Sequence, residues 1–229
     1  NGDIVRGPIM RFVPPQSPPL VGRMPPWTPL AKIMKWSFDH VPQAMLRPFV
    51  MSFLTTALGP SPDLFKEGAL LIDKNGERFC EETQKPGFKV PHRPNRCAYI
   101  LMDAAIAKKF EAWPYFVSTA PGVAYAYLSD YRRNRPDMFW SGDNLADFAN
   151  KIGADPERLK ATIANYNAQG RQDRPGTFPA LTEKPYVALG PVRSYVVFTD
   201  GGLRVTEQLQ VLDRDNAIIP GLYAAGSNG

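Results

Sequence analysis

The chain has 229 residues, a net charge of +5 and 44% apolar residues, enough to bury a sizeable core in one large domain or two small ones. Its basic residues are scattered without a nucleic-acid motif, and its two cysteines are too few for a disulfide framework, so we expect no nucleic-acid partner, no metal site and a reducing, cytoplasmic setting. No apolar run reaches the roughly 18 residues that a membrane-spanning helix requires.

The first 29 residues predict a connecting segment. Apolar residues that alternate with Arg6 and Arg11 indicate one or two short strands within 4–13. The many prolines between positions 14 and 29 favour extended, polyproline-like chain, either a semi-rigid linker or a strap that leads into a lid. Because the chain starts on Asn1 without an initiator methionine, we expect it to be a fragment of a longer protein.

Two helices are predicted between residues 30 and 58. Apolar residues recur at helical spacing up to Val41, and Pro42 begins a second segment that is apolar almost all round, with Pro48 in its first two turns. Three interpretations of 27–58 stay open: core packing, a lid over a hydrophobic substrate, and peripheral contact with a membrane surface. Trp27 and Trp36, with lysine and arginine neighbours, suit the last of these.

A hairpin is predicted at 68–82. An apolar strand at 68–73 is followed by the turn signal Asn75-Gly76 and by a return strand at 78–80. Arg78 and Glu82 are then four residues apart. Taken alone, this spacing is typical of an exposed ion pair that contributes about 1 kcal/mol or less.

The middle of the chain alternates strands and helices. Residues 97–103 predict a buried strand, and Asp103 caps the helix that follows. Ser141 or Asp143 is expected to cap a helix that ends at Gly153, and 155–157 open another that runs to 170. Residues 170–184 predict an exposed loop. Between them, 113–131 hold an aromatic cluster, either a core or a surface that stacks on a planar apolar ligand: Trp113, Tyr115, Phe116, Tyr125, Tyr127 and Tyr131.

The C-terminal region predicts short strands and close turns. Strands at 184–189 and 192–198 lead into Thr199-Asp200-Gly201-Gly202, and a hairpin follows at 211–219. Pro220-Gly221 indicates a second turn before a short buried strand at 222–225. The small residues from Gly226 onward would let the backbone approach a ligand closely.

The order of these C-terminal pieces resembles the flavoprotein superfamily of fumarate reductase, succinate dehydrogenase and 3-ketosteroid dehydrogenases, nearer the ketosteroid branch. The resemblance rests on the Gly-Gly-Leu-x-Val segment, the Val-Leu-Asp hairpin and Ile-Pro-Gly-Leu-Tyr-Ala-Ala-Gly, with support from 68–82. It implies an α+β fold: a connection from an FAD-binding domain at 1–29, a cap or substrate domain at 30–190, and return strands at 191–229. The superfamily's Gly-x-Gly-x-x-Gly turn is absent, so FAD is expected in the intact parent protein and not in this fragment.

The resemblance also implies the site residues. Cofactor contacts fall on Gly202, Ala225, Gly226 and Ser227. Substrate contacts fall on Phe198, Thr199, Gly201, Gly202, Arg78 and Glu82. Tyr186 and Tyr195 are the alternatives for the tyrosine that handles the substrate's proton.

Two departures from the superfamily pattern bear on the substrate. Pro86 stands where fumarate reductases carry a proton-donating arginine, and Phe198 stands where they carry a substrate-binding histidine. Both favour an apolar, steroid-like substrate dehydrogenated or reduced at a C–C bond next to a carbonyl. The alternatives are a fumarate reductase-like enzyme acting on a small carboxylate, and a non-catalytic module that binds an apolar ligand or a membrane surface.

Overall fold

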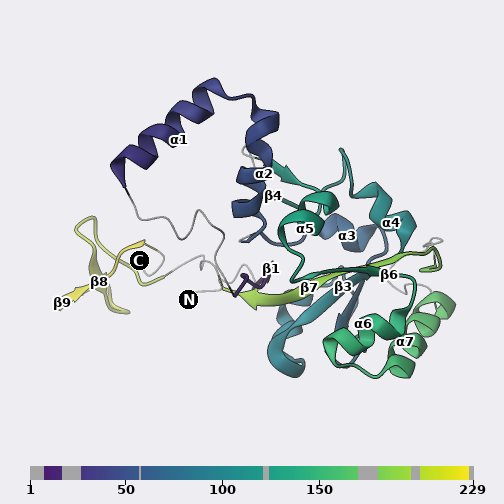
Figure 1. The fold of residues 1–229 in the computed structure, drawn as a ribbon. Helices are drawn as coiled ribbons and strands as arrows, with labels where there is room; N and C mark the ends of the chain where they lie inside the picture. Colours follow the sequence, from purple (N-terminus) through teal and green to yellow (C-terminus); the bar gives the residue numbers. More distant parts are fainter. Residues whose placement is uncertain are drawn as a thin grey trace. The chain divides into compact units, whose positions relative to one another are not determined.

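The structure, a computed structural model, describes residues 8–16, 27–56, 58–120, 124–169, 180–196 and 202–226. The chain divides into a larger compact unit, Met10–Ser194, and a smaller one made of Tyr195–Gly229 with Asn1–Ile9 (Figure 1). These boundaries differ from those of the predicted division into 1–29, 30–190 and 191–229, which stays a prediction.

A five-stranded sheet organises the larger unit. Its order is β1-β7-β3-β2, and β6 also pairs with β7; β2 is antiparallel to β3, and β3 and β6 are antiparallel to β7. All residues of β2 are buried, as expected for a strand covered on both faces. The predicted α+β class is confirmed. The strand bounds are β1 Ile9–Phe12, β2 Leu70–Asp73, β3 Ala98–Met102, β6 Phe139–Gly142 and β7 Tyr186–Tyr195.

Helices cover this sheet on both sides (Figure 1). On one side, Phe148 of α6 meets Tyr99 of β3 edge-on with ring centroids 6.1 Å apart. On the other, Tyr131 of α5 packs on Phe12 of β1 at 4.9 Å. The helices are α1 Thr28–His40, α2 Gln43–Leu54, α3 Pro62–Lys66, α4 Ala104–Lys109, α5 Leu128–Asn134, α6 Leu145–Ile152 and α7 Pro156–Gln169. Short 3₁₀ helices span Pro86–Phe88, Val90–His92 and Pro94–Arg96, and a separate ribbon pairs β4 Ser118–Ala120 with β5 Ala124–Ala126.

Most helix boundaries follow local capping chemistry. Asp103 accepts a hydrogen bond from the Ile106 backbone N–H at 3.0 Å, which confirms its predicted capping role. The cap of α6 was predicted wrongly. The cap is Asn144, whose side-chain oxygen accepts a hydrogen bond from the Ala146 backbone N–H, and not Ser141 or Asp143. The helix cannot begin earlier, because β6 still pairs with β7 at Gly142.

The prediction of separate strands at 184–189 and 192–198 is wrong, because β7 is one continuous strand over Tyr186–Tyr195. Gly190 and Pro191 do not interrupt it, because neighbouring segments bond to both. The Gly190 N–H donates to the Met138 carbonyl at 3.0 Å, and the Pro191 carbonyl accepts from the Val13 N–H at the same distance. Proline cannot donate, but its carbonyl still takes part in pairing.

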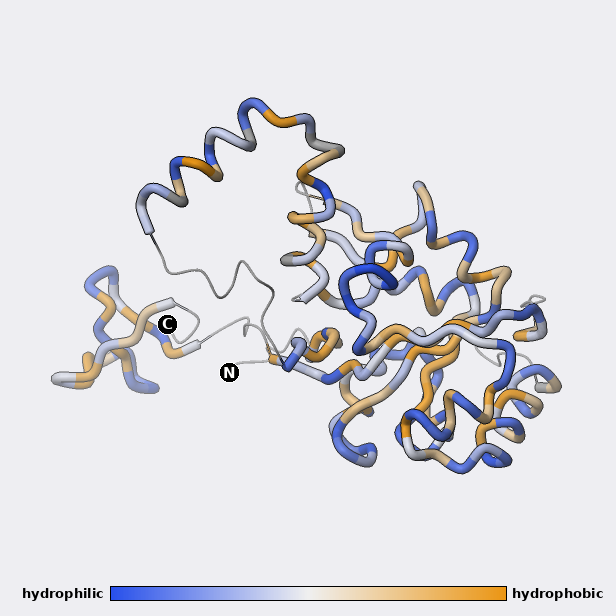
Figure 2. The backbone as a smooth tube through the Cα atoms, viewed as in Figure 1, coloured by the Kyte–Doolittle hydropathy of each residue, from blue (hydrophilic) through white to orange (hydrophobic). Residues whose placement is uncertain are grey.

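The described part of the smaller unit contains a hairpin of β8, Gln210–Leu212, and β9, Ile218–Tyr223. The hairpin was predicted correctly. The second turn at Pro220-Gly221 and the buried strand after it were not: both residues lie inside β9, and every residue of β9 is exposed in this chain. Figure 2 shows apolar residues along this hairpin, where burial was expected from composition alone.

Candidate functional site

Arg78 and Glu82 form a forked ion pair beside β2. Arg78 donates from Nε to Glu82 Oε1 at 3.0 Å and from Nη2 to Oε2 at 2.8 Å, and also reaches Glu81 at 2.8 Å. The predicted return strand at 78–80 is reduced to a single bridge between Ile72 and Arg78. The following loop is therefore held mainly by side-chain contacts. An arginine that donates two hydrogen bonds to one carboxylate, as Arg78 does to Glu82, forms one of the stronger charge-assisted contacts.

This pair is not the exposed surface pair that spacing alone suggests. Glu82 is 2% exposed, and its Oε1 also accepts from the Leu71 backbone N–H at 3.2 Å. The Glu82 carboxylate raises the pKa of Arg78 further above its ordinary value. The Arg78 guanidinium lies over the Tyr166 ring of α7, 5.4 Å from its centroid. The contacts of both side chains support the fold, and a role in substrate binding stays a prediction.

A hollow of about 430 Å³ lies next to this pair. Cys80 is one of its lining residues, and burial, followed by the charge of Glu82, raises the pKa of its thiol to about 12. A thiol with that pKa is protonated at neutral pH and is a poor nucleophile. The lining is Glu77, Arg78, Cys80, Glu81, Thr162, Asn165 and Tyr166.

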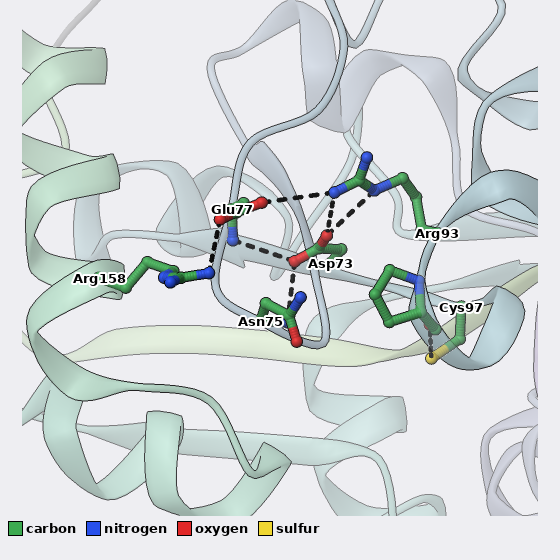
Figure 3. A network of polar contacts seen from close by, with 7 residues as sticks. Asp73, Asn75, Glu77, Arg93, Cys97 and Arg158 are labelled. Atoms are coloured by element: carbon green, nitrogen blue, oxygen red, sulfur yellow. Dashed lines mark hydrogen bonds and ion pairs between the residues drawn. The ribbon is translucent and has the colours of Figure 1, made fainter.

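A second polar network surrounds the turn after β2 (Figure 3). Asp73 is fully buried, pairs with Arg93 through its Oδ2 and accepts two backbone N–H groups with its Oδ1. Glu77 then bridges Arg93 and Arg158, the latter at 2.7 Å. Sequence reasoning missed this network because Arg93 lies 20 positions after Asp73. An aspartate that ends a wholly apolar strand was the available signal.

The aromatic cluster of 113–131 is divided between core and surface. Tyr131 is fully buried and bonds to Ser118 at 2.6 Å, and burial raises the pKa of its phenol well above the ordinary value. Tyr125 of β5 instead contacts both Trp113 and Phe116, with ring centroids 5.2 and 5.0 Å apart, and Trp113 is 64% exposed. Core packing therefore accounts for Tyr131, and the exposed rings remain available to a ligand.

The loop that contains Pro86 is bonded to the end of β7. Ser194 donates its hydroxyl proton to the Gly87 carbonyl at 2.6 Å. Gly87 follows Pro86 in the first 3₁₀ helix, and Ser194 precedes Tyr195, the last residue of β7. One short hydrogen bond thus joins the residue next to Pro86 to the residue next to Tyr195.

Tyr186 and Tyr195 are not brought together. Tyr186 is the first residue of β7, 8% exposed, and opposes Gly142 of β6, whereas Tyr195 is the last and is half-buried. Nine residue steps at about 3.3 Å each put them up to roughly 30 Å apart along the strand. They cannot serve one reaction centre together.

The predicted cofactor contacts, and the predicted substrate contacts from Phe198 to Gly202, fall in the smaller unit. Phe198, Thr199, Gly201 and Ser227 lie outside the described residues. Gly202, Ala225 and Gly226 are described, and Gly226 has a positive φ of 64° with no atom within 4 Å of where a Cβ would stand. This backbone is open to close approach by a planar group.

Two further properties concern the residues that the structure covers. Within them, no group of three His, Cys, Asp or Glu side chains could hold a metal ion. No helix among them is both long and apolar enough to cross a membrane.

Comparisons with known proteins identify relatives. A family model described as an FAD binding domain matches residues 48–228. The chain is 27% identical over 168 residues to a fumarate reductase (cytochrome) of Shewanella frigidimarina, covering 69% of this chain and 26% of that protein. It is 25% identical over 169 residues to a urocanate reductase of Eggerthella lenta, with 69% and 26% covered. The chain therefore spans about a quarter of the length of these relatives.

A solved structure has the same fold. The chain superposes on a 3-ketosteroid Δ1-dehydrogenase from Sterolibacterium denitrificans with a TM-score of 0.53 at 21% identity, covering 76% of this chain and 35% of that one. At this identity the match concerns the fold alone.

Proposed function

Because the chain belongs to the FAD binding domain family, whose cofactor is FAD, we propose that it is part of a flavin-dependent oxidoreductase. The proposed reaction reduces or dehydrogenates a C–C bond next to a carbonyl of an apolar, steroid-like substrate. One observation carries the proposal: the hydrogen bond from Ser194 to Gly87 joins the Pro86 loop to the end of β7, where Tyr195 lies.

The residue available for proton transfer at that point differs from the one that fumarate reductases use. By the resemblance, Pro86 takes the position of the proton-donating arginine, and proline has no proton to give. The hydroxyl of Tyr195, on the strand bonded to the same loop, can donate or accept one. We therefore assign proton transfer at the substrate carbon next to the carbonyl to Tyr195, and not to the buried Tyr186.

The described C-terminal residues fit FAD as one wall of its site. Gly202, Ala225 and Gly226 have no side chain or only a methyl group, and nothing lies within 4 Å of where a Cβ of Gly226 would stand, so this backbone would allow the flavin to approach closely. FAD would supply hydride transfer. The backbone N–H of Gly202 is suited to polarise the substrate carbonyl, because a fixed donor stabilises the negative charge that develops on oxygen.

The experiment uses the full-length flavoprotein. Cyclic enones, ketosteroids and fumarate are compared as substrates, with Tyr195→Phe and Tyr186→Phe as a matched pair. We expect turnover of an enone or ketosteroid, and a loss of about 10²–10⁴-fold in kcat for Tyr195→Phe alone. Rapid reduction of fumarate with no turnover of any enone would overturn the substrate class. An equal loss in Tyr186→Phe would overturn the assignment of Tyr195.

We also propose a second function for α1, contact with an anionic membrane surface. Trp27, Ile33 and Trp36 are 65%, 62% and 58% exposed, and Lys32 and Lys35 supply positive charge on the same helix. The family match begins only at residue 48, so α1 lies outside it. Exposed apolar and aromatic side chains flanked by lysines are typical of helices that lie in a membrane interface.

Liposome co-sedimentation tests this second function. Anionic vesicles should sediment the chain, neutral vesicles should do so less, and Ile33→Asp should abolish the difference. Met45→Asp, a change at a 72% exposed residue of α2, is the matched control. Equal sedimentation of wild type and Ile33→Asp would contradict a membrane role for α1.

A further inference from the structure

Two arginines line one hollow in the larger unit. Arg96 ends the third 3₁₀ helix and Arg193 lies near the end of β7. With Pro91, Asn95 and Ser194 they line an open surface hollow of about 450 Å³, and both arginines are exposed. That volume lies in the range of about 300–1,000 Å³ usual for small-molecule sites. The proposed flavin reaction assigns no role to either of these arginines.

These arginines differ from most others in the same unit. Arg47, Arg78, Arg93, Arg132, Arg135 and Arg158 each form an ion pair with an aspartate or glutamate. Within the described ranges, no carboxylate forms such a pair with Arg96 or Arg193. Two positive charges therefore line the same hollow without a negative partner from the described chain.

The backbone holds Arg96 in an unusual conformation. Asn95 and Arg96 have φ angles of 56° and 52°, in the left-handed region that non-glycine residues rarely adopt. The Arg96 N–H donates to the Arg93 carbonyl at 2.8 Å, and buried Cys97 follows directly. Such conformations persist only where the surrounding structure enforces them, and they cluster at ligand sites.

The opposite wall is equally fixed. Ser194 is held by its bond to Gly87, and Arg193 precedes it in β7. Val192, the residue before Arg193, pairs with Ala98 of β3, so the backbone of Arg193 lies next to β3. Because the Ser194 proton is already donated, the hydrogen-bond donors that line the hollow are the two guanidinium groups and the Asn95 amide.

We propose that this hollow binds an oxyanion group, carboxylate or phosphate, of a small ligand. Guanidinium groups match both anions through paired N–H donors, and two of them on fixed walls favour one oxyanion between them. Two kinds of ligand carry such an oxyanion: an apolar molecule with a carboxylate, such as a substrate, and phosphate. The inference does not depend on the proposed flavin reaction.

NMR titration of the 229-residue chain at low salt tests the site. Inorganic phosphate is added in one arm and benzoate, a carboxylate on an apolar ring, in the other. At least one should give saturable shifts centred on the backbone amides of Asn95, Arg96 and Arg193. Tighter phosphate binding indicates free phosphate or a phosphate ester, and tighter benzoate binding indicates a carboxylate ligand.

Variants separate this site from general basic charge. Arg96→Gln and Arg193→Gln should each weaken binding about tenfold, because each removes a charge-assisted contact. Arg193→Lys should retain part of the affinity through its charge. Arg133→Gln, at another exposed arginine outside the hollow, should stay within about twofold of wild type. Failure of both anions to saturate, or an equal loss in Arg133→Gln, would overturn the proposal.

Discussion

The turn after β2 and the turn between β8 and β9 use the same local chemistry in opposite surroundings. In the larger unit the turn begins at Asp73, and in the smaller unit at Asp213. Each aspartate accepts backbone N–H groups from two and four residues later, at 2.8–3.1 Å. Three residues after each aspartate, Gly76 and Asn216 have φ angles of 81° and 66°.

The surroundings make these turns differ. Asp73 is fully buried, and its second oxygen pairs with Arg93. Asp213 is exposed, as is all of β9 beyond it. A turn of the same pattern can therefore be decisive in a core and nearly dispensable on a surface, because an unpaired buried charge is far more costly than an exposed one. Substitutions at matched positions measure that difference.

The largest expected effect comes from removing the aspartates. Asp73→Ala should lower the free energy of unfolding of the larger unit by about 3–5 kcal/mol, because Arg93 loses its buried partner and two N–H groups lose their acceptor. Urea denaturation followed by tryptophan fluorescence measures it. Asp213→Ala should change that transition by less than about 0.5 kcal/mol and only speed hydrogen exchange at Ala217. Equal losses in the two variants would refute the comparison.

A smaller effect is expected at the left-handed positions. Gly76→Ala should destabilise the larger unit by about 2–3 kcal/mol, because alanine is strained at this φ and its Cβ would stand 3.2 Å from the Leu159 Cβ. Asn216→Ala carries only the backbone strain, about 1 kcal/mol. Thermal unfolding measures the effect of Gly76→Ala, and hydrogen exchange measures the effect of Asn216→Ala. An unchanged unfolding temperature in Gly76→Ala would mean that α7 shifts to make room for the added methyl group.

The effect that is smallest at neutral pH is a pH dependence from Cys80, which appears only in alkaline solution. The pKa of Cys80 is raised from 9.0 to about 12, so the folded chain keeps a proton that the unfolded chain has lost. The resulting stabilisation is complete below about pH 9 and declines between about 9 and 12. Cys80→Ser should make the urea midpoint fall less steeply over that range. Parallel slopes for wild type and variant would exclude this contribution.

Several local signals predicted the structure correctly. The Asp103 cap, the turn at Asn75-Gly76 and the hairpin at 211–219 depend on contacts between residues no more than a few positions apart. The errors have a common cause in longer contacts. Gly190 and Pro191 belong to a continuous strand because Met138 and Val13 bond to them, and no pattern in 184–198 contains that information.

The candidate site divides in the same way. Resemblance identified Arg78, Glu82 and Tyr195 as candidates, but only packing showed that Glu82 is buried with Arg78 as its partner. The bond from Ser194 to Gly87 joins segments 107 positions apart, and our proposal of Tyr195 over Tyr186 rests on it. No sequence pattern connects Arg96 with Arg193, and only the fold brings them to the same hollow.

The sequence by itself determined the α+β class and the FAD family, because its C-terminal motifs resemble those of known flavoproteins. It also determined the turn at each aspartate, because each turn depends on hydrogen bonds within a few residues. The tertiary structure alone decided which aspartate is buried, that Ser194 of β7 bonds to the residue after Pro86, and which arginines lack a carboxylate partner among the described residues. Burial and charge pairing depend on neighbours from distant parts of the chain, and those neighbours are set only when the sheet and its helices pack.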